Sequence, residues 1–159
     1  MNNGTWFELE DGSGYKCNNY IYRYMEDRKP EIENVFFTSY NAERGQTDST
    51  PCVAGGTGIN VCKYAKEGKR VIALSQEFLE WSMYSGDGNA PIFKKDEVVW
   101  LESTSLPDDP RCNGYFIVGD AMNPRFVGGD RARNMEKRGD IFMLNRSDNV
   151  SCYSNVYRI

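Results

Sequence analysis

The chain of 159 residues contains no histidine. This absence excludes catalysis by a histidine acid or base, the Ser-His-Asp and Cys-His nucleophile systems, and the usual zinc sites. In an enzyme of this composition, proton transfer must therefore be carried out by carboxylates.

The sequence also lacks any Cys-x-x-Cys pair, so we expect no metal site and no cofactor. Five cysteines are present, a number that indicates an oxidising compartment. They are Cys17, Cys52, Cys62, Cys112 and Cys152. Cys52 and Cys62 bracket a short Gly-rich loop and form the best candidate for a disulfide. The alternative is a set of reduced, buried thiols.

No apolar run reaches the roughly 18 residues of a membrane helix, so membrane insertion is not expected. Residues 1–7 lack the basic and apolar regions of a signal peptide, so either a signal has been removed and Met1 added, or export does not use one. The net charge of -4 and the pI of about 5.0 argue against a general nucleic-acid binder.

A local basic run stands out from this acidic background, and its simpler interpretation is a solvated loop rather than a ligand-binding patch. Its members are Arg125, Arg131, Arg133, Lys137 and Arg138.

Short runs with strand composition, separated by Gly- and Pro-rich connections, predict an all-β fold that closes or nearly closes into a barrel. The runs are residues 35–40, 70–74, 97–101, 115–118, 140–144 and 150–159. Residues 75–81 are expected to form a short helix with Ser75 as its N-cap. Long polar loops connect these elements.

Four pieces of the sequence occur in an informative order. They are TDSTPCVAGGTGINVC at residues 47–62, VIALS at 71–75, GYFIVGD at 114–120 and RGDIFM at 138–143. This order resembles the three-aspartate (3D) domain of small peptidoglycan lytic transglycosylases, including the catalytic barrel of membrane-bound lytic transglycosylase A. The resemblance covers about residues 36–145.

The resemblance implies a six-stranded double-psi β-barrel, a fold also used by expansins and some cellulases. We expect residues 1–34 to be an N-terminal extension packed on the barrel and residues 35–159 to be the catalytic barrel. The expected architecture therefore combines a mainly β domain with short helices and long loops.

The resemblance also implies roles for individual residues. Asp140, which opens the Asp-Ile-aromatic strand, corresponds to the acid/base of the family, and Asp120 to an aspartate that lines the groove. Gly56 and Thr57 lie in the loop that looks like the family's Thr-Ala-x-Gly loop and are expected to bind substrate. Ser75 stands where the first aspartate of the family follows the Val-Ile-Ala run.

From the residues themselves, each position has a structural alternative. An aspartate at a strand start, such as Asp140, is often a turn cap. Asp48 is a candidate substrate contact, although a hydrogen bond within its own loop is the simpler interpretation. The glycines of residues 55–58 can allow a tight turn or let a glycan approach the backbone.

The chemistry of the family requires one carboxylic acid. Lytic transglycosylases cleave the β-1,4 bond between N-acetylmuramic acid and N-acetylglucosamine, and the muramyl 6-hydroxyl attacks its own anomeric carbon. Water is not the nucleophile, so the carboxylate pair of ordinary glycosidases is not needed. The pKa of Asp140 should be raised, by a nearby Asp120 carboxylate or by the apolar Ile141 and Phe142.

The sequence thus predicts a lytic transglycosylase that acts on peptidoglycan glycan strands and leaves 1,6-anhydromuramic ends. Two alternatives stay open: a non-catalytic, expansin-like carbohydrate-binding barrel, and a structural module of a phage tail or a secreted assembly. All three place the protein outside the cytoplasm, in the periplasm, at the cell wall, in the medium or in a phage virion.

Overall fold

The computed structural model describes residues 28–42, 52–129 and 137–159. Cys17, Asp48, Arg131 and Arg133 lie outside the described residues. The chain divides into two compact units, residues 1–30 and residues 31–159. The second unit holds every strand described below, and its first strand begins at Ile32, within the segment expected to be the extension.

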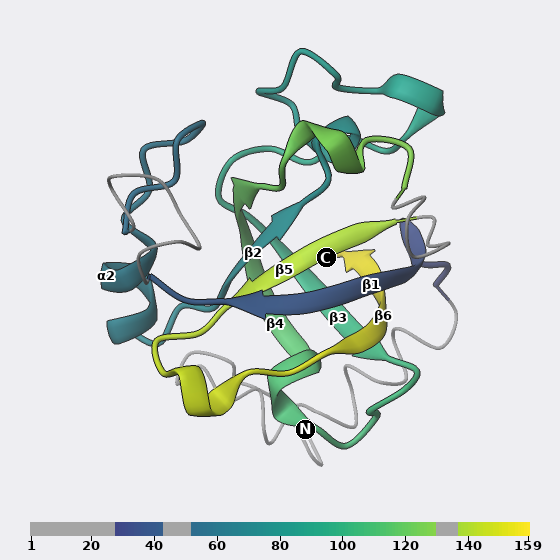
Figure 1. The fold of residues 1–159 in the computed structure, drawn as a ribbon. Coiled ribbons are helices and arrows are strands. Elements are labelled where there is room, and N and C mark those ends of the chain that lie inside the picture. The colour runs from purple at the N-terminus through teal and green to yellow at the C-terminus, as the bar shows by residue number, and fades with distance from the viewer. Residues whose placement is uncertain (1–27, 43–51, 130–136) are drawn as a thin grey trace. The chain divides into compact units, whose positions relative to one another are not determined.

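Six strands form a closed barrel in which the neighbours follow the order β1-β5-β2-β4-β3-β6 (Figure 1). Their bounds are Ile32–Tyr40 for β1, Val71–Leu74 for β2, Glu97–Ser103 for β3, Gly114–Ala121 for β4, Arg138–Phe142 for β5 and Cys152–Arg158 for β6. Each overlaps a run of strand composition in the sequence. The prediction of a mainly β, barrel-forming chain is confirmed.

The strands pair in both directions. β1 runs parallel to β5, and β2 runs parallel to β4, whereas the other four neighbouring pairs are antiparallel. Parallel neighbours require long crossover connections, which is why segments far apart in the sequence meet in the barrel wall.

Large apolar side chains fill the barrel interior, following the alternation expected of a sheet with one buried face. Examples are Phe37 on β1, Ile72 on β2 and Ile141 on β5, each at most 1% exposed. The same core takes in Phe78, Leu79 and Phe93 from the connection between β2 and β3.

A second apolar layer covers the outside of β2 and its neighbours. α2 (Val61–Lys66) begins at Asn60, whose side chain accepts a hydrogen bond from the Lys63 amide at 2.9 Å. Val61 and Cys62 of this helix pack with Val71 and Phe142. Ala73 packs instead with Met122 and Phe126, the latter from the 3-10 turn η5 (Pro124–Phe126).

The prediction of a helix at residues 75–81 is wrong in its extent. A single 3-10 turn, η2 (Gln76–Phe78), follows β2, and Ser75 does not cap it with its side chain. The Ser75 hydroxyl donates instead to the Phe126 carbonyl at 2.8 Å. Since the next residues enter the barrel core, the chain cannot continue along a helical axis there.

Further 3-10 turns interrupt the connections. They are η3 (Asp87–Asn89), η4 (Pro110–Cys112) and η7 (Arg146–Asp148). Among the described residues no helix is long and apolar enough to cross a membrane.

Two disulfides occur in the described part of the chain. Cys52 is bonded to Cys62, as predicted, with their α-carbons 5.3 Å apart. Cys112 is bonded to Cys152 and joins η4 to the start of β6, a pairing that the sequence left open. Disulfides of this kind are typical of proteins in an oxidising environment.

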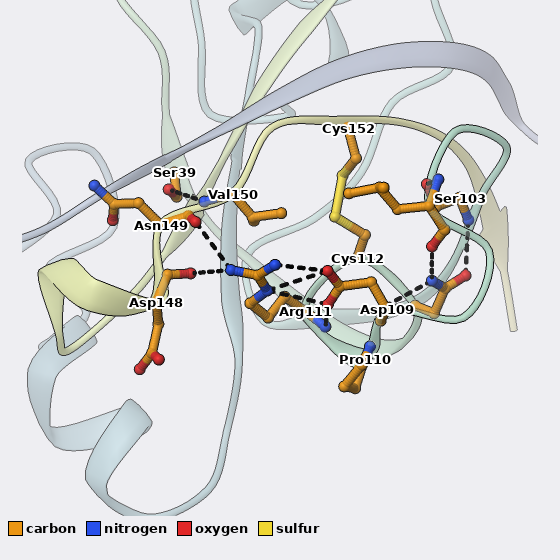
Figure 2. Close-up of polar contacts among 12 residues, drawn as sticks. Ser39, Ser103, Asp109, Pro110, Arg111, Cys112, Asp148, Asn149, Val150 and Cys152 are labelled. Atoms are coloured by element: carbon orange, nitrogen blue, oxygen red, sulfur yellow. Dashed lines mark hydrogen bonds and ion pairs between the residues drawn. A yellow bond between two sulfur atoms is a disulfide. The ribbon is translucent and has the colours of Figure 1, made fainter.

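A polar cluster surrounds the second disulfide (Figure 2). The Arg111 guanidinium contacts the Asp109 carboxylate at 2.7 Å and donates to the carbonyls of Asp148 at 3.2 Å and Asn149 at 2.9 Å. Hydrogen bonding to Arg111 lowers the pKa of Asp109. The cluster links the turn before β4 to the turn before β6.

Candidate functional site

One row of side chains crosses four adjacent strands on the outer face of the barrel. Thr38 pairs with Asp140 between β1 and β5, and Asp140 pairs with Ala73 between β5 and β2. Ala73 in turn pairs with Asp120 between β2 and β4. Directly paired residues share a face of the sheet. The α-carbons of the two aspartates are therefore about 10 Å apart, two strand spacings, with a small alanine between them.

A bulge in β4 aims Asp120 at this face. Ile72 pairs with Val118, but the next residue of β2, Ala73, pairs with Asp120, so Gly119 is an extra residue in β4. Val118 points into the core, and strict alternation would send Asp120 the same way. An extra residue reverses the direction of the following side chain, a known use of bulges beside active sites.

The space at the centre of the bulge favours a glycine. A Cβ at Gly119 would lie 3.0 Å from Val71 Cγ1 and 3.1 Å from Ile59 Cδ1. The Thr57 hydroxyl donates to the Gly119 carbonyl at 2.8 Å and accepts from the Ile59 amide at 3.2 Å. Thr57 therefore holds the Gly-rich loop against the bulge.

Both aspartates line a single pocket of about 450 Å³. Its described lining is Tyr40, Val53, Ala54, Gly55, Gly56, Val61, Ala73, Asp120, Ala121, Met122, Asn123, Arg125, Phe126 and Asp140. A volume of this size is within the usual range for small-molecule sites.

Asp140 is partly buried, and burial raises its pKa above the ordinary value. The hydrogen bond that Thr38 Oγ1 donates to Asp140 Oδ1 and the charge of Arg138 act in the opposite direction, whereas the charge of Asp120 adds to the rise. The raised pKa keeps the carboxyl protonated at higher pH than usual, which suits a general acid.

Asp120 is held in place through both of its oxygens. The Tyr40 hydroxyl donates to Oδ2 at 2.7 Å, and the Ala121 amide donates to Oδ1 at 2.8 Å. Burial, followed by the Asp120 carboxylate, raises the pKa of Tyr40 well above its usual value. Tyr40 therefore remains a hydrogen-bond donor throughout the ordinary pH range.

The basic run does not behave as one solvated loop. Arg138 is 3% exposed, and its guanidinium lies over the rings of Phe36 at 5.3 Å and Phe126 at 4.7 Å. Its Nη2 donates to Thr38 Oγ1 at 3.1 Å. Arg125 is exposed and lines the pocket, with its guanidinium 4.7 Å from the Phe126 ring.

The Gly-rich loop contributes its backbone to the pocket. Gly55 and Gly56 are both in the lining, and a Cβ at Gly56 would lie 2.4 Å from Trp81 Nε1. Gly56 is thus required by close approach rather than by a turn. Gly58, with a φ of 73°, is the glycine that serves the turn.

Two of the predicted substrate contacts, Thr57 and Ser75, are placed differently from Gly56. The Thr57 hydroxyl bonds to the Gly119 carbonyl of β4, and the residue is outside the described pocket lining. Ser75 is 0% exposed and is bonded to the Phe126 carbonyl, so it cannot reach a ligand in this conformation. Asp48 lies outside the described residues.

Sequence reasoning missed Thr38, Tyr40 and Arg138 as parts of the site. The alternation of buried Val35 and Phe37 in β1 implies that Thr38 and Tyr40 face the other way. No local signal indicates that this face lies against Asp140, since the two segments are about a hundred residues apart in the chain.

The described residues contain no group of three or more cysteine, aspartate or glutamate side chains that could hold a metal ion. The chemistry available in the pocket is that of two carboxyls, one phenol and one guanidinium. Comparisons of the chain with protein-family models, with curated proteins and with solved structures find no match.

Proposed function

We propose that the protein is a peptidoglycan lytic transglycosylase with Asp140 as its single acid/base. The observation that carries the proposal is the position of Asp140: a partly buried carboxyl of raised pKa, in the lining of a pocket that it shares with Asp120. These features are the ones that protonation of a glycosidic oxygen requires.

We propose further that the barrel is of the double-psi type. The closed order of six strands, with two parallel pairs among antiparallel ones, supports this assignment. The Gly-rich loop of residues 53–58 would then correspond to the glycan-binding loop of the family.

In the proposed reaction, protonated Asp140 donates its proton to the leaving oxygen of N-acetylglucosamine as the bond from the muramyl anomeric carbon breaks. The muramyl 6-hydroxyl attacks the same carbon, and its proton passes to the Asp140 carboxylate. Every proton is then accounted for without water. Asp120, fixed by Tyr40 and the Ala121 amide, presents negative charge beside the developing oxocarbenium.

Asp140→Asn tests the assignment directly. The amide has nearly the volume of the carboxyl and still accepts from Thr38, but it cannot shuttle a proton. We expect glycan release from purified sacculi to fall on the order of a hundredfold or more. Mass analysis of wild-type products should find 1,6-anhydromuramic ends, which are lighter than hydrolytic ends by one water.

Two matched variants complete the experiment. Asp120→Asn should cause a smaller loss, because this residue transfers no proton in the proposed reaction. Asp108→Asn, at an exposed loop position outside the described pocket lining, should act like wild type. Full activity of the Asp140 variant would refute the site, and products carrying the extra water would make the protein a hydrolase.

The second candidate is an expansin-like barrel that binds glycan without cleaving it. The serine at position 75 favours it, because the position that corresponds to the first family aspartate carries no acid and lies outside the described pocket lining. Sedimentation with sacculi, without release of soluble fragments, is the result expected for this candidate.

A further inference from the structure

We propose that Thr38 and Arg138 are positioning residues that keep the exchangeable proton of Asp140 on a single oxygen, Oδ2. The inference rests on the proposed function for its catalytic consequence. Its structural part, the hydrogen bond that Thr38 donates to the Asp140 carboxyl with the help of Arg138, can be tested without any activity.

The direction of the Thr38 hydroxyl follows from its two partners. A guanidinium has donors and no acceptor, so Arg138 Nη2 can only donate to Thr38 Oγ1, at 3.1 Å. The hydroxyl hydrogen is donated to the other hydrogen-bonding partner of Thr38 Oγ1, which is Asp140 Oδ1. Arg138 occupies an acceptor site of the hydroxyl and so favours the orientation in which Thr38 donates to the carboxyl.

The hydrogen bond from Thr38 to Oδ1 determines which oxygen of the Asp140 carboxyl carries the proton. The neutral carboxyl keeps the hydrogen bond from Thr38 to Oδ1 unchanged when its proton lies on Oδ2. Oδ2 is then the oxygen that loses and regains the proton. Within the described part of the chain, the side-chain hydrogen bond that acts on the Asp140 carboxyl is the one from Thr38, and it is made to Oδ1.

One oxygen that both gives and takes the proton matches the proposed reaction. The proton leaves Oδ2 for the glycosidic oxygen as that carbon–oxygen bond breaks. The proton of the muramyl 6-hydroxyl returns to Oδ2 as the new bond to the anomeric carbon forms. A carboxyl free to rotate would present the wrong oxygen for part of the time, and such misplacement is costly.

The arginine itself is held rigidly. It is buried between the rings of Phe36 and Phe126, and it shares β5 with Asp140, two residues away on the same face. A buried charge is seldom retained for stability alone, because desolvation offsets most of its attraction to a partner. In this proposal, the role of the buried Arg138 charge is to orient the Thr38 hydroxyl.

The charged and titratable groups near Asp140 come from each strand or turn that lines its side of the pocket. β1 supplies Tyr40, β5 supplies Arg138, β4 supplies Asp120, and η5 supplies Arg125. β2 contributes the uncharged Ala73 at the position paired with Asp140. Of these groups, Arg138 lowers the pKa of Asp140 and Asp120 raises it.

The test compares Thr38→Val with Thr38→Ser in the full chain. Valine has the shape of threonine without the hydroxyl, whereas serine keeps the hydroxyl. The readout is the titration of the Asp140 carboxyl carbon by NMR, assigned with Asp140→Asn. We expect an upward shift of the Asp140 midpoint in the valine variant and a wild-type midpoint in the serine variant.

Arg138→Met provides an independent test, in which the Asp140 titration midpoint is again measured by NMR. Loss of the contact that orients Thr38 and of the positive charge should also raise the midpoint. The NMR spectra report folding at the same time, and Thr38→Ala replaces the valine variant if valine disturbs the barrel. The proposal is overturned if folded Thr38→Val or Thr38→Ala protein titrates at Asp140 with the wild-type midpoint. It is also overturned if Arg138→Met lowers the stability of the protein but leaves the Asp140 midpoint unchanged.

Measurements of glycan cleavage then distinguish failure of this proposal from failure of the proposed function. If the protein cleaves glycan, kcat should fall by up to about a hundredfold in Thr38→Val with KM nearly unchanged, and Thr38→Ser should restore it. If the midpoints shift as expected but no variant, including wild type, releases fragments, the positioning stands and the transglycosylase assignment fails.

Discussion

At neutral pH, the Asp140 carboxylate should make the folded protein less stable than a variant with an uncharged side chain at this position. Its pKa is raised on folding, so the native state binds more protons than the unfolded state between the two values. Stability is therefore fully present below the unfolded pKa of about 3.9 and is lost as the pH rises through the folded value.

Asp140→Asn should remove this pH dependence. We expect its melting temperature at pH 7 to exceed that of wild type by a few degrees, and the gap to close near pH 4. In a protein of this size about 1 kcal/mol moves the melting temperature by about 2–4 °C, which calorimetry resolves. Asp108→Asn is the control, and a gap that does not vary with pH would contradict the raised pKa.

Among the loops and turns, the Gly-rich loop offers a matched pair of adjacent glycines. A Cβ at Gly56 would strike the Trp81 indole, whereas a Cβ at Gly55 would meet no atom within 4 Å. Gly56→Ala must therefore move the loop or the tryptophan, at a cost of about 1–3 kcal/mol.

We expect Gly56→Ala to melt earlier and to bind glycan fragments more weakly, because the same residue lines the pocket. Gly55→Ala should match wild type in chemical denaturation. Equal behaviour of the two variants would show that the loop is not packed against Trp81.

The two disulfides should contribute differently. Cys52 and Cys62 are separated by 10 positions, and Cys112 and Cys152 by 40. Restriction of the unfolded chain predicts losses of roughly 2–3 kcal/mol for the short loop and about 4 kcal/mol for the long one.

For glycan binding we expect the opposite order: loss of the Cys52–Cys62 disulfide should weaken binding more than loss of the Cys112–Cys152 disulfide. The Cys52–Cys62 bond anchors the loop whose residues 53–56 line the pocket, whereas Cys112 and Cys152 lie in the barrel core. Paired Cys→Ser variants, compared by urea denaturation and by glycan binding at a temperature where both are folded, test this. Weaker binding after loss of Cys112–Cys152 alone would reverse the assignment.

For the molecule as a whole, residues 31–159 should fold alone. This unit holds all six strands of the closed barrel, the described core and both described disulfides. We expect a protein of these residues to unfold cooperatively, in one calorimetric transition. Broad, non-cooperative melting would indicate that residues 1–30 complete the core.

The closing strand should be indispensable to that unit. β6 pairs with both β1 and β3, so its removal exposes two strand edges and takes Cys152 and Val156 out of the core. Exposed edges favour aggregation. Proteins that end before residue 152 should be insoluble or unfolded by circular dichroism.

Features that depend on neighbours in the chain could be predicted from the amino-acid order alone. Runs of β-branched and aromatic residues located the six strands, and Gly and Pro located the loops between them. The pairing of Cys52 with Cys62 was predictable because only 10 positions separate them. The absence of histidine, a property of composition that folding does not alter, limited acid/base chemistry to carboxylates.

Features that depend on register between distant strands arise only in the folded barrel. The contacts of Thr38 with Asp140 and of Tyr40 with Asp120 join segments 102 and 80 positions apart, and a shift by one residue would turn each side chain to the opposite face. The bulge at Gly119 sets that register for Asp120. Arg138 is buried because Phe126 of η5, Phe36 and the Thr38 hydroxyl surround its guanidinium, and only the folded barrel brings these groups together.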